Sequence, residues 1–221
     1  TVNWSVNGVV QTPFSWSGSL NYYDTTSVVI GNWNFAALGS YIFKAWTSNP
    51  NGTSDGFVIN DTLTLPPSYT ALNGTYTIGG VSPDFGNFNA AVSALNVKGI
   101  CGPVVFNVRN GTYVEQVIIT AVFGASAANK ITFQSESAIN TSVTLNNNVS
   151  MNAFTLYLSG ADYFEFKNMT FKSEFGSSAK VIKIESGSDH NLFYNNIFIS
   201  TFAYAGVSSG GSGVPKNRLM L

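Results

Sequence analysis

One stretch of this chain occurs twice at a fixed distance. Residues 159–173 read SGADYFEFKNMTFKS and residues 186–200 read SGSDHNLFYNNIFIS, and the two agree at seven of fifteen positions at an offset of 27. A repeat of roughly 20 to 50 residues is typical of a solenoid, in which each repeat stacks on the next. Because each copy contains two apolar runs of strand length, we expect one turn of a coil that advances by one strand spacing.

Further strand-like runs extend this coil. Runs that begin at 104, 131, 154 and 181 predict successive rung offsets of 27, 23 and 27. The hairpin dipeptides Asn-Gly and Asp-Gly mostly do not separate these runs, which argues against a meander of antiparallel strands. The sequence therefore predicts a right-handed parallel β-helix over residues 74–221.

The offset of 27 also predicts which side chains meet between rungs. Two pairs of phenylalanines should stack inside the cylinder, and one pair of asparagines should pass a hydrogen bond from rung to rung at a corner. Ser-Gly pairs at 159–160 and 186–187 indicate another corner, where glycine tolerates positive φ. The predicted pairs are Phe166 with Phe193, Phe171 with Phe198, and Asn168 with Asn195.

A single helix is predicted, within residues 83–99. Asp84 or Asn87 can cap its start and Gly99 can end it. We expect this helix to cover the first open end of the coil, since an open end is a row of unpaired backbone groups. No comparable segment covers the second end, so we expect a fragment of a longer polypeptide, with more rungs beyond Leu221. The apolar face of the helix consists of Phe88, Ala91, Val92 and Leu95.

Residues 1–65 have a different pattern. Val2, Trp4 and Val6 alternate with polar residues, as in a strand with one buried face. Similar runs, separated by turn residues, predict a small antiparallel sandwich. Two prolines then stiffen a linker at 66–73, so the fold class is all-β, with an immunoglobulin-like module followed by the β-helix. The other predicted strands of the module are 27–33, 39–46 and 56–60.

Composition narrows the classes of partner. Only 10% of residues are charged, against roughly 25% in an average soluble protein. The net charge is -1, and no basic patch could neutralise a phosphate backbone, so nucleic acid is not expected as a partner. No apolar run approaches the roughly 18 residues of a membrane span. The lone Cys101 excludes an internal disulfide framework and is interpreted as a small buried apolar residue.

Few residues point to catalysis. Asp162 and Asp189 fall at the same point of the repeat, where each can accept a backbone hydrogen bond in a turn. They could alternatively act as a paired acid and base on a glycosidic bond, but no third group divides the two roles. His190 has no nucleophile beside it. Glu165 and Glu185 are scattered and have Lys167 and Lys183 as expected partners on the outer face, so we predict no catalytic residue, metal or cofactor.

Outward-facing aromatic residues are the stronger functional signal. Strand alternation places Tyr163 and Tyr194 on the outside of successive rungs. Tyrosine on a flat β surface can stack on sugar rings, and it can equally be covered by a neighbouring domain. Tyr163 and Tyr194 are therefore the candidate ligand-binding residues, with carbohydrate or a surface polymer as the ligand.

The segment 74–119 resembles the opening of the pectin-lyase-like right-handed β-helix, especially as found in large secreted surface proteins of Bacteroidota. Within it, NGTYVEQVII is similar to a pectinesterase segment, with matches at Gly111, Tyr113 and Glu115. The resemblance spans roughly residues 70–200. It implies the fold more specifically than it implies any chemistry.

The segment 1–65 resembles the CARDB-type immunoglobulin-like adhesion modules of the same exported proteins. Such proteins are similar to gliding and biofilm adhesins carried by the type IX secretion system. The motifs DTT and DTL resemble the O-glycosylation sites used by that phylum, which makes Thr25 and Thr62 candidate glycosylation sites. The resemblance implies a secreted or cell-surface location, with other domains of the same polypeptide and the secretion machinery as partners.

Three functions remain open on this basis. The first is a non-catalytic adhesin that binds a surface or a carbohydrate. The second is the N-terminal part of a polysaccharide lyase or carbohydrate esterase whose catalytic rungs lie downstream. The third is a structural spacer that binds no ligand.

Overall fold

The computed structural model describes residues 1–21, 23–35, 39–49, 52–53, 56, 59, 61–148, 154–174 and 180–200, and the backbone of 207–209 and 218–220. The chain forms two compact units, Thr1–Thr70 and Ala71–Leu221. The division falls inside the predicted linker 66–73. That segment is not a plain linker, because strand pairs form on both sides of the division. No helix in the described part of the chain is long and apolar enough to cross a membrane.

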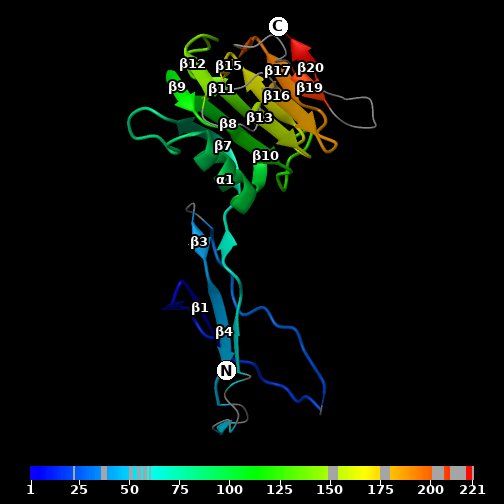
Figure 1. The fold of residues 1–221 in the computed structure, drawn as a ribbon. Helices are drawn as coiled ribbons and strands as arrows, with labels where there is room; N and C mark the ends of the chain where they lie inside the picture. Colours follow the sequence, from blue (N-terminus) through cyan, green and yellow to red (C-terminus); the bar gives the residue numbers. More distant parts are fainter. Residues whose placement is uncertain are drawn as a thin grey trace. The chain divides into compact units, whose positions relative to one another are not determined.

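The first unit contains a four-stranded antiparallel sheet in the order β2-β1-β4-β5, of which Figure 1 labels β1 and β4. A two-stranded ladder pairs β3 with β6. The small core consists of Trp4, Val6 and Tyr41, with Ile30, Phe43 and Ala45 packed against it. The strands are β1 (Val2–Val6), β2 (Val9–Val10), β3 (Ser40–Tyr41), β4 (Phe43–Thr47), β5 (Thr62–Thr64) and β6 (Ser68–Tyr69).

Two predicted strands of this unit have different outcomes. The prediction of a strand at 27–33 is wrong, because this segment pairs with no strand in the described part of the chain and Ile30 instead packs on the core around Trp4. Segment 56–60 lies mostly outside the described residues. The immunoglobulin-like sandwich stays a prediction, since one four-stranded sheet and one short ladder are what the described residues form.

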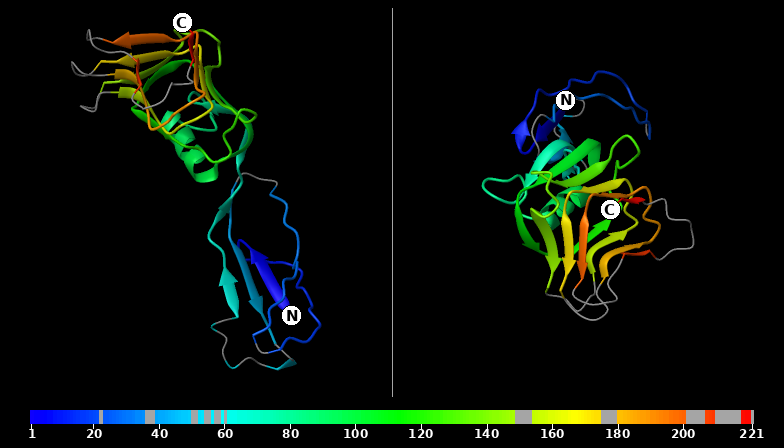
Figure 2. Two further views of the ribbon diagram at one scale, coloured as in Figure 1. Left: turned by 90° about the vertical axis from the view of Figure 1, so that its right-hand side faces the viewer. Right: turned by 90° about the horizontal axis from the view of Figure 1, so that it is seen from above.

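The second unit is a parallel coil with three sheets (Figures 1 and 2). Sheet I contains β7-β8-β11-β14-β17-β20, sheet II contains β9-β12-β15-β18, and sheet III contains β10-β13-β16-β19. Each turn visits sheets I, II and III in order, and all pairings in these sheets are parallel. This is the architecture of a parallel β-helix.

The elements of the second unit follow the chain in this order. They are β7 (Leu72–Ile78), α1 (Phe88–Lys98), β8 (Ile100–Val108), β9 (Gly111–Val114), β10 (Val117–Thr120), β11 (Ile131–Ser135), β12 (Val143–Asn147), β13 (Phe154–Ser159), β14 (Phe164–Lys167), β15 (Thr170–Ser173), β16 (Lys180–Glu185), β17 (Leu192–Tyr194), β18 (Ile197–Ser200), β19 (Val207–Ser209) and β20 (Arg218–Met220).

A column of phenylalanines runs through the core. Phe106, Phe133, Phe166 and Phe193 pair in register on successive strands of sheet I, with ring centroids 4.6, 5.7 and 4.9 Å apart. The differences between the residue numbers of successive phenylalanines give rung offsets of 27, 33 and 27. The predicted offsets of 27, 23 and 27 are wrong because the starting points 104 and 131 belong to sheet I whereas 154 and 181 belong to sheet III.

The middle rung is longer because one of its corners is longer. Residues 136–142 separate β11 from β12, whereas only 109–110, 168–169 and 195–196 separate the corresponding strands of the other rungs. The offset of 27 thus holds only where the corner between sheets I and II is tight. Phe171 and Phe198 form a second stack in sheet II, at 5.7 Å.

Asparagines hold the tight corners. Asn168 and Asn195 have left-handed backbone, with φ of 55° and 51°, and Asn195 Nδ2 donates to Asn168 Oδ1 at 2.8 Å. Next to this exposed ladder, Asn196 is buried and spans two rungs: its Oδ1 accepts from the Met169 N–H and its Nδ2 donates to the Phe166 carbonyl. Asn191 makes the equivalent pair of bonds to Phe164 and Ala161.

Helix α1 has the predicted apolar face, as Phe88, Ala91, Val92 and Leu95 are all buried in the core of the coil. Of the two candidate caps, Asn87 is the one used, since its Oδ1 accepts from the Ala90 N–H at 2.8 Å. Gly99, at φ 63°, ends the helix.

Cys101 corrects another expectation. It is exposed rather than buried, because β8 alternates inward Ile100 and outward Cys101. The predicted small apolar core residue therefore lies on the outside of the coil.

Candidate functional site

The outer face of sheet I gathers most of the candidate residues. Inward phenylalanines alternate with outward polar and aromatic side chains, so each rung presents every second residue to the outside. With the register of the strands, these residues form three short rows on successive rungs. The rows are Lys130, Thr132 and Gln134, then Tyr163, Glu165 and Lys167, then His190, Leu192 and Tyr194.

Tyr163 and His190 stack on one another across adjacent rungs. Their ring centroids are 4.9 Å apart and their planes differ by 14°. Both residues also have left-handed backbone, with φ of 62° and 58°. A tyrosine rarely adopts this conformation, whereas histidine adopts it more often, and it costs of order 1 kcal/mol or more for a residue other than glycine. Asn168 and Asn195 have the same backbone at a structural corner, so what distinguishes Tyr163 and His190 is that their rings also stack on the outer face.

A groove of about 270 Å³ lies beside the stacked rings. Its wall combines two rings, an aliphatic side chain, an amide and two charges. A site with apolar surface and a few convergent polar groups is the usual form of a small-ligand site. The lining residues are Ala127, Lys130, Tyr163, Glu165, His190, Asn191 and Leu192.

Glu165 is the buried charge of this groove. Its carboxylate pairs with Lys130 Nζ at 2.8 Å and with Lys167 Nζ at 2.5 Å, and Thr132 Oγ1 donates to it at 3.4 Å. Burial alone would raise the pKa of this carboxyl, but the hydrogen bonds and charges of the two lysines together outweigh burial and lower it. Glu165 is therefore a fixed anion at neutral pH and cannot act as a proton donor there.

The other acidic residues have structural partners. Asp162 Oδ1 accepts from the Asp189 N–H at 2.6 Å, which is the turn role that the repeat predicted for Asp162. Glu185 pairs with Lys183 at 2.8 Å on sheet III. Within the described residues, no three His, Cys, Asp or Glu side chains come together as a metal site.

The structure separates the two predicted ligand-binding tyrosines. Tyr163 lines the groove, whereas Tyr194 lies opposite Lys167 at the other end of the strands. Four residues of strand separate these positions, or about 13 Å. Tyr194 is 46% exposed, and it is not among the residues that line the groove.

The sequence interpretation missed three groove residues, which are Ala127, Lys130 and Asn191. Lys130 precedes Tyr163 by 33 residues, so neither the offset of 23 predicted for this rung nor the offset of 27 aligned the two. Asn191 has no polar counterpart one repeat earlier, where Phe164 occupies the position. The signal available for Asn191 was a polar residue at a position that the repeat assigns to the core.

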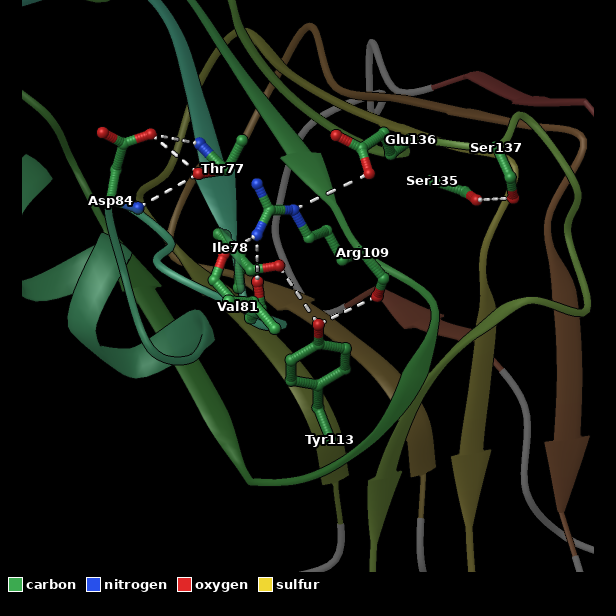
Figure 3. Close-up of polar contacts among 10 residues, drawn as sticks. Thr77, Ile78, Val81, Asp84, Arg109, Tyr113, Ser135, Glu136 and Ser137 are labelled. Carbon is green, nitrogen blue, oxygen red and sulfur yellow. Dashed lines mark hydrogen bonds and ion pairs between the residues drawn. The ribbon is translucent and has the colours of Figure 1, made fainter.

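The pectinesterase-like segment has structural roles. The Tyr113 hydroxyl lies 2.9 Å from the Arg109 carbonyl oxygen and 3.1 Å from that of Ile78 (Figure 3). Burial, the largest cause, raises the pKa of Tyr113. The Glu115 carboxylate accepts from the Phe88 and Asn89 N–H groups at 3.1 and 2.9 Å, at the first turn of α1. The segment thus joins α1 and β7 to the coil.

Charged side chains near Tyr113 form hydrogen bonds and an ion pair with the neighbouring segments (Figure 3). Arg109 donates to the Val81 carbonyl oxygen and its Nε lies 3.8 Å from Glu136. Asp84 accepts from the Thr77 N–H at 2.7 Å, and this backbone hydrogen bond is the main reason that the pKa of Asp84 is lowered. These contacts order the loop before α1.

No protein-family model matches the chain, and no curated protein sequence matches it. Two solved structures of a pectin methylesterase from Aspergillus niger are similar to it, one deglycosylated and one penultimately deglycosylated with an N-acetylglucosamine stub. Identities are 16% and 17%, the TM-score is 0.42 for both, and each match covers 65% of this chain. The matches cover 52% and 53% of those chains, about half their length. The assignment to the parallel β-helix rests on the strand pairing above.

Proposed function

We propose that the second unit binds carbohydrate, or a similar surface polymer, in the groove beside Tyr163 and His190. It would do so as a non-catalytic part of a secreted or cell-surface adhesin. The observation that carries this proposal is the stacked pair of rings, because both rings line a groove and Tyr163 holds a backbone conformation that is unfavourable for a bulky residue. Strain of this kind is retained where the side chain has a use.

The chemistry of the wall suits a sugar. Ring and aliphatic surfaces from Tyr163, His190 and Leu192 can cover the apolar side of a pyranose. Lys130 and Glu165 can hydrogen-bond to hydroxyl groups, and their own ion pair holds them in place. The groove is open to solvent at Lys130, whose side chain is 51% exposed.

Catalysis is the alternative, as part of a lyase or esterase with further rungs. Glycosidic cleavage by two carboxyls requires one with a raised pKa. In this groove the carboxyl of Glu165 has a lowered pKa, and Asp162 is engaged with a backbone N–H. These two observations favour binding over turnover.

The proposal also includes secretion of the protein and its attachment to a surface. Thr25 and Thr62 are exposed, which is a requirement for the O-glycosylation proposed at both. The low charge content suits an extracellular β protein. Surface location, type IX secretion and attachment through an immunoglobulin-like first unit are parts of this proposal.

A glycan-binding assay on the full chain tests the site. We expect an array of plant and microbial polysaccharides to identify a ligand, and Tyr163→Ala to weaken its binding about tenfold, or ~1.4 kcal/mol, by titration calorimetry. His190→Ala should weaken binding similarly. Tyr157→Ala removes a tyrosine from the outer face of sheet III and serves as the matched control.

Three outcomes would contradict the proposal. Equal losses for Tyr157→Ala and Tyr163→Ala would show that the groove is not the site. A loss for Tyr194→Ala alone would move the site to the other end of the strands. Release of methanol, acetate or unsaturated sugars from a bound polysaccharide would favour the enzyme.

A further inference from the structure

The outer face of sheet II carries a lysine and an asparagine side by side. Asn146 on β12 pairs in register with Lys172 on β15, and both point outward on adjacent rungs. The residues beyond them in the same column are Val114 on β9 and Ile199 on β18. The polar pair is therefore flanked along the coil by two aliphatic side chains.

One carboxylate holds both members of the pair. Glu174 Oε1 lies 2.5 Å from Lys172 Nζ, and Glu174 Oε2 accepts from Asn146 Nδ2 at 2.6 Å. The hydrogen bond from Lys172 is the largest cause of a lowered pKa at Glu174, followed by that from Asn146. The support for a reaction is the geometry, since one carboxylate contacts both the amine nitrogen of Lys172 and the amide nitrogen of Asn146.

Asn146 differs from an ordinary surface amide. It is only 5% exposed, and among the described residues its Oδ1 has no hydrogen-bond partner. A buried carbonyl without a donor is costly, at about 1–3 kcal/mol. The amide to which it belongs and the amine of Lys172 contact the same Glu174 carboxylate from adjacent strands.

We propose that Lys172 and Asn146 join in an intramolecular isopeptide bond. The Lys172 ammonium gives a proton to Glu174, and the neutral amine attacks Cγ of Asn146. The bond between Nζ and Cγ forms, and the bond between Cγ and Nδ2 breaks. Of the two protons that Nζ loses, one leaves with Nδ2 as ammonia and the other passes through Glu174 to solvent. No oxidant or other reactant is needed, because an amide and an amine yield a new amide and ammonia.

The link would join two rungs that otherwise hold together by hydrogen bonds and packing. It would enclose the chain between residues 146 and 172, so that sheet II could not separate there under force or denaturant. It would also remove one positive charge from the outer face. The carbohydrate-binding proposal does not depend on it.

The mass of the intact chain tests the link directly. We expect the purified full chain, after incubation at neutral pH, to be lighter than its sequence by one ammonia. Fragment spectra of a digest should show one branched peptide that contains both Asn146 and Lys172. Lys172→Arg and Glu174→Gln should each restore the full mass.

Lys183→Arg is the matched control, because Lys183 forms the same kind of pair with Glu185 but lies opposite Tyr157 rather than an asparagine. This variant should keep the loss of ammonia. A folded wild-type chain with the full mass and no branched peptide would overturn the proposal. A loss of ammonia that persists in Lys172→Arg would overturn it as well, since the modification would then lie elsewhere.

Discussion

At the scale of residues, single asparagines satisfy backbone groups at corners that strand ladders do not reach. A tight turn between two sheets leaves N–H and C=O groups that point away from any neighbouring strand. Asn196 satisfies one of each, and it is 6% exposed. Its neighbour Asn195 also bonds across rungs, but it is solvent-exposed and has left-handed backbone. The two adjacent asparagines therefore differ in how much their side chains contribute to stability.

Replacing each of them should show this difference. We expect Asn196→Ala to lower the free energy of unfolding by about 2 kcal/mol or more, because the Met169 N–H and the Phe166 C=O are then buried without partners. Asn195→Gly keeps the backbone conformation and exposes the lost partner to water, so its cost should stay below about 0.5 kcal/mol. Urea denaturation followed by circular dichroism measures both. Equal costs would show that the buried bonds carry no special weight.

At the scale of elements, α1 is attached to the coil by more than its apolar face. The Glu115 carboxylate accepts the Phe88 and Asn89 N–H groups, which the first turn of a helix leaves unpaired. An anion at this end also interacts favourably with the helix dipole. The segment that resembles pectinesterases thus has a structural reason for its glutamate without reference to catalysis.

Loss of this carboxylate should loosen the start of α1. We expect Glu115→Ala to cost about 1–3 kcal/mol and to speed hydrogen exchange at the Phe88 and Asn89 amides. Glu136→Ala is the control, because Glu136 forms only a half-exposed contact of 3.8 Å with Arg109 and should cost under about 1 kcal/mol. Unchanged exchange at both amides in Glu115→Ala would mean that packing alone holds the helix.

At the scale of the whole molecule, the repeat predicted the core better than the surface. An offset of 27 correctly aligned Phe166 with Phe193, because inward positions in a tight rung admit the same kind of side chain. The same offset could not find Lys130, since the preceding rung has a longer corner and corners vary freely in length. Asn191 was missed because the repeat aligns it with the core residue Phe164, and the sequence does not show the two backbone groups that its side chain binds.

In the first unit, the sequence-based prediction of a strand failed for a different physical reason. Residues 27–33 alternate as a strand does, but alternation reports a buried face and not a pairing partner. Ile30 is partly buried against the core around Trp4, but its segment forms no strand pairing within the described residues. The exposure of Cys101, in the second unit, likewise depends on which face of β8 it occupies, and a slip of one residue reverses that face.

We expect a substitution in the phenylalanine column to lower the stability of the second unit and to leave that of the first unit unchanged. Phe133 is fully buried and stacks on Phe106 and Phe166, so Phe133→Ala should cost the second unit about 3–5 kcal/mol. All four tryptophans lie in the first unit, so their fluorescence reports on that unit alone. They are Trp4, Trp16, Trp33 and Trp46.

We expect Phe133→Ala to lower the denaturation midpoint seen by far-ultraviolet circular dichroism and to leave the fluorescence midpoint in place. Phe123→Ala, at a residue that is 89% exposed, should shift neither by an amount above about 0.5 kcal/mol. A fluorescence midpoint that follows the circular dichroism would show instead that the chain unfolds as one cooperative body, in which the stability of the first unit depends on the coil.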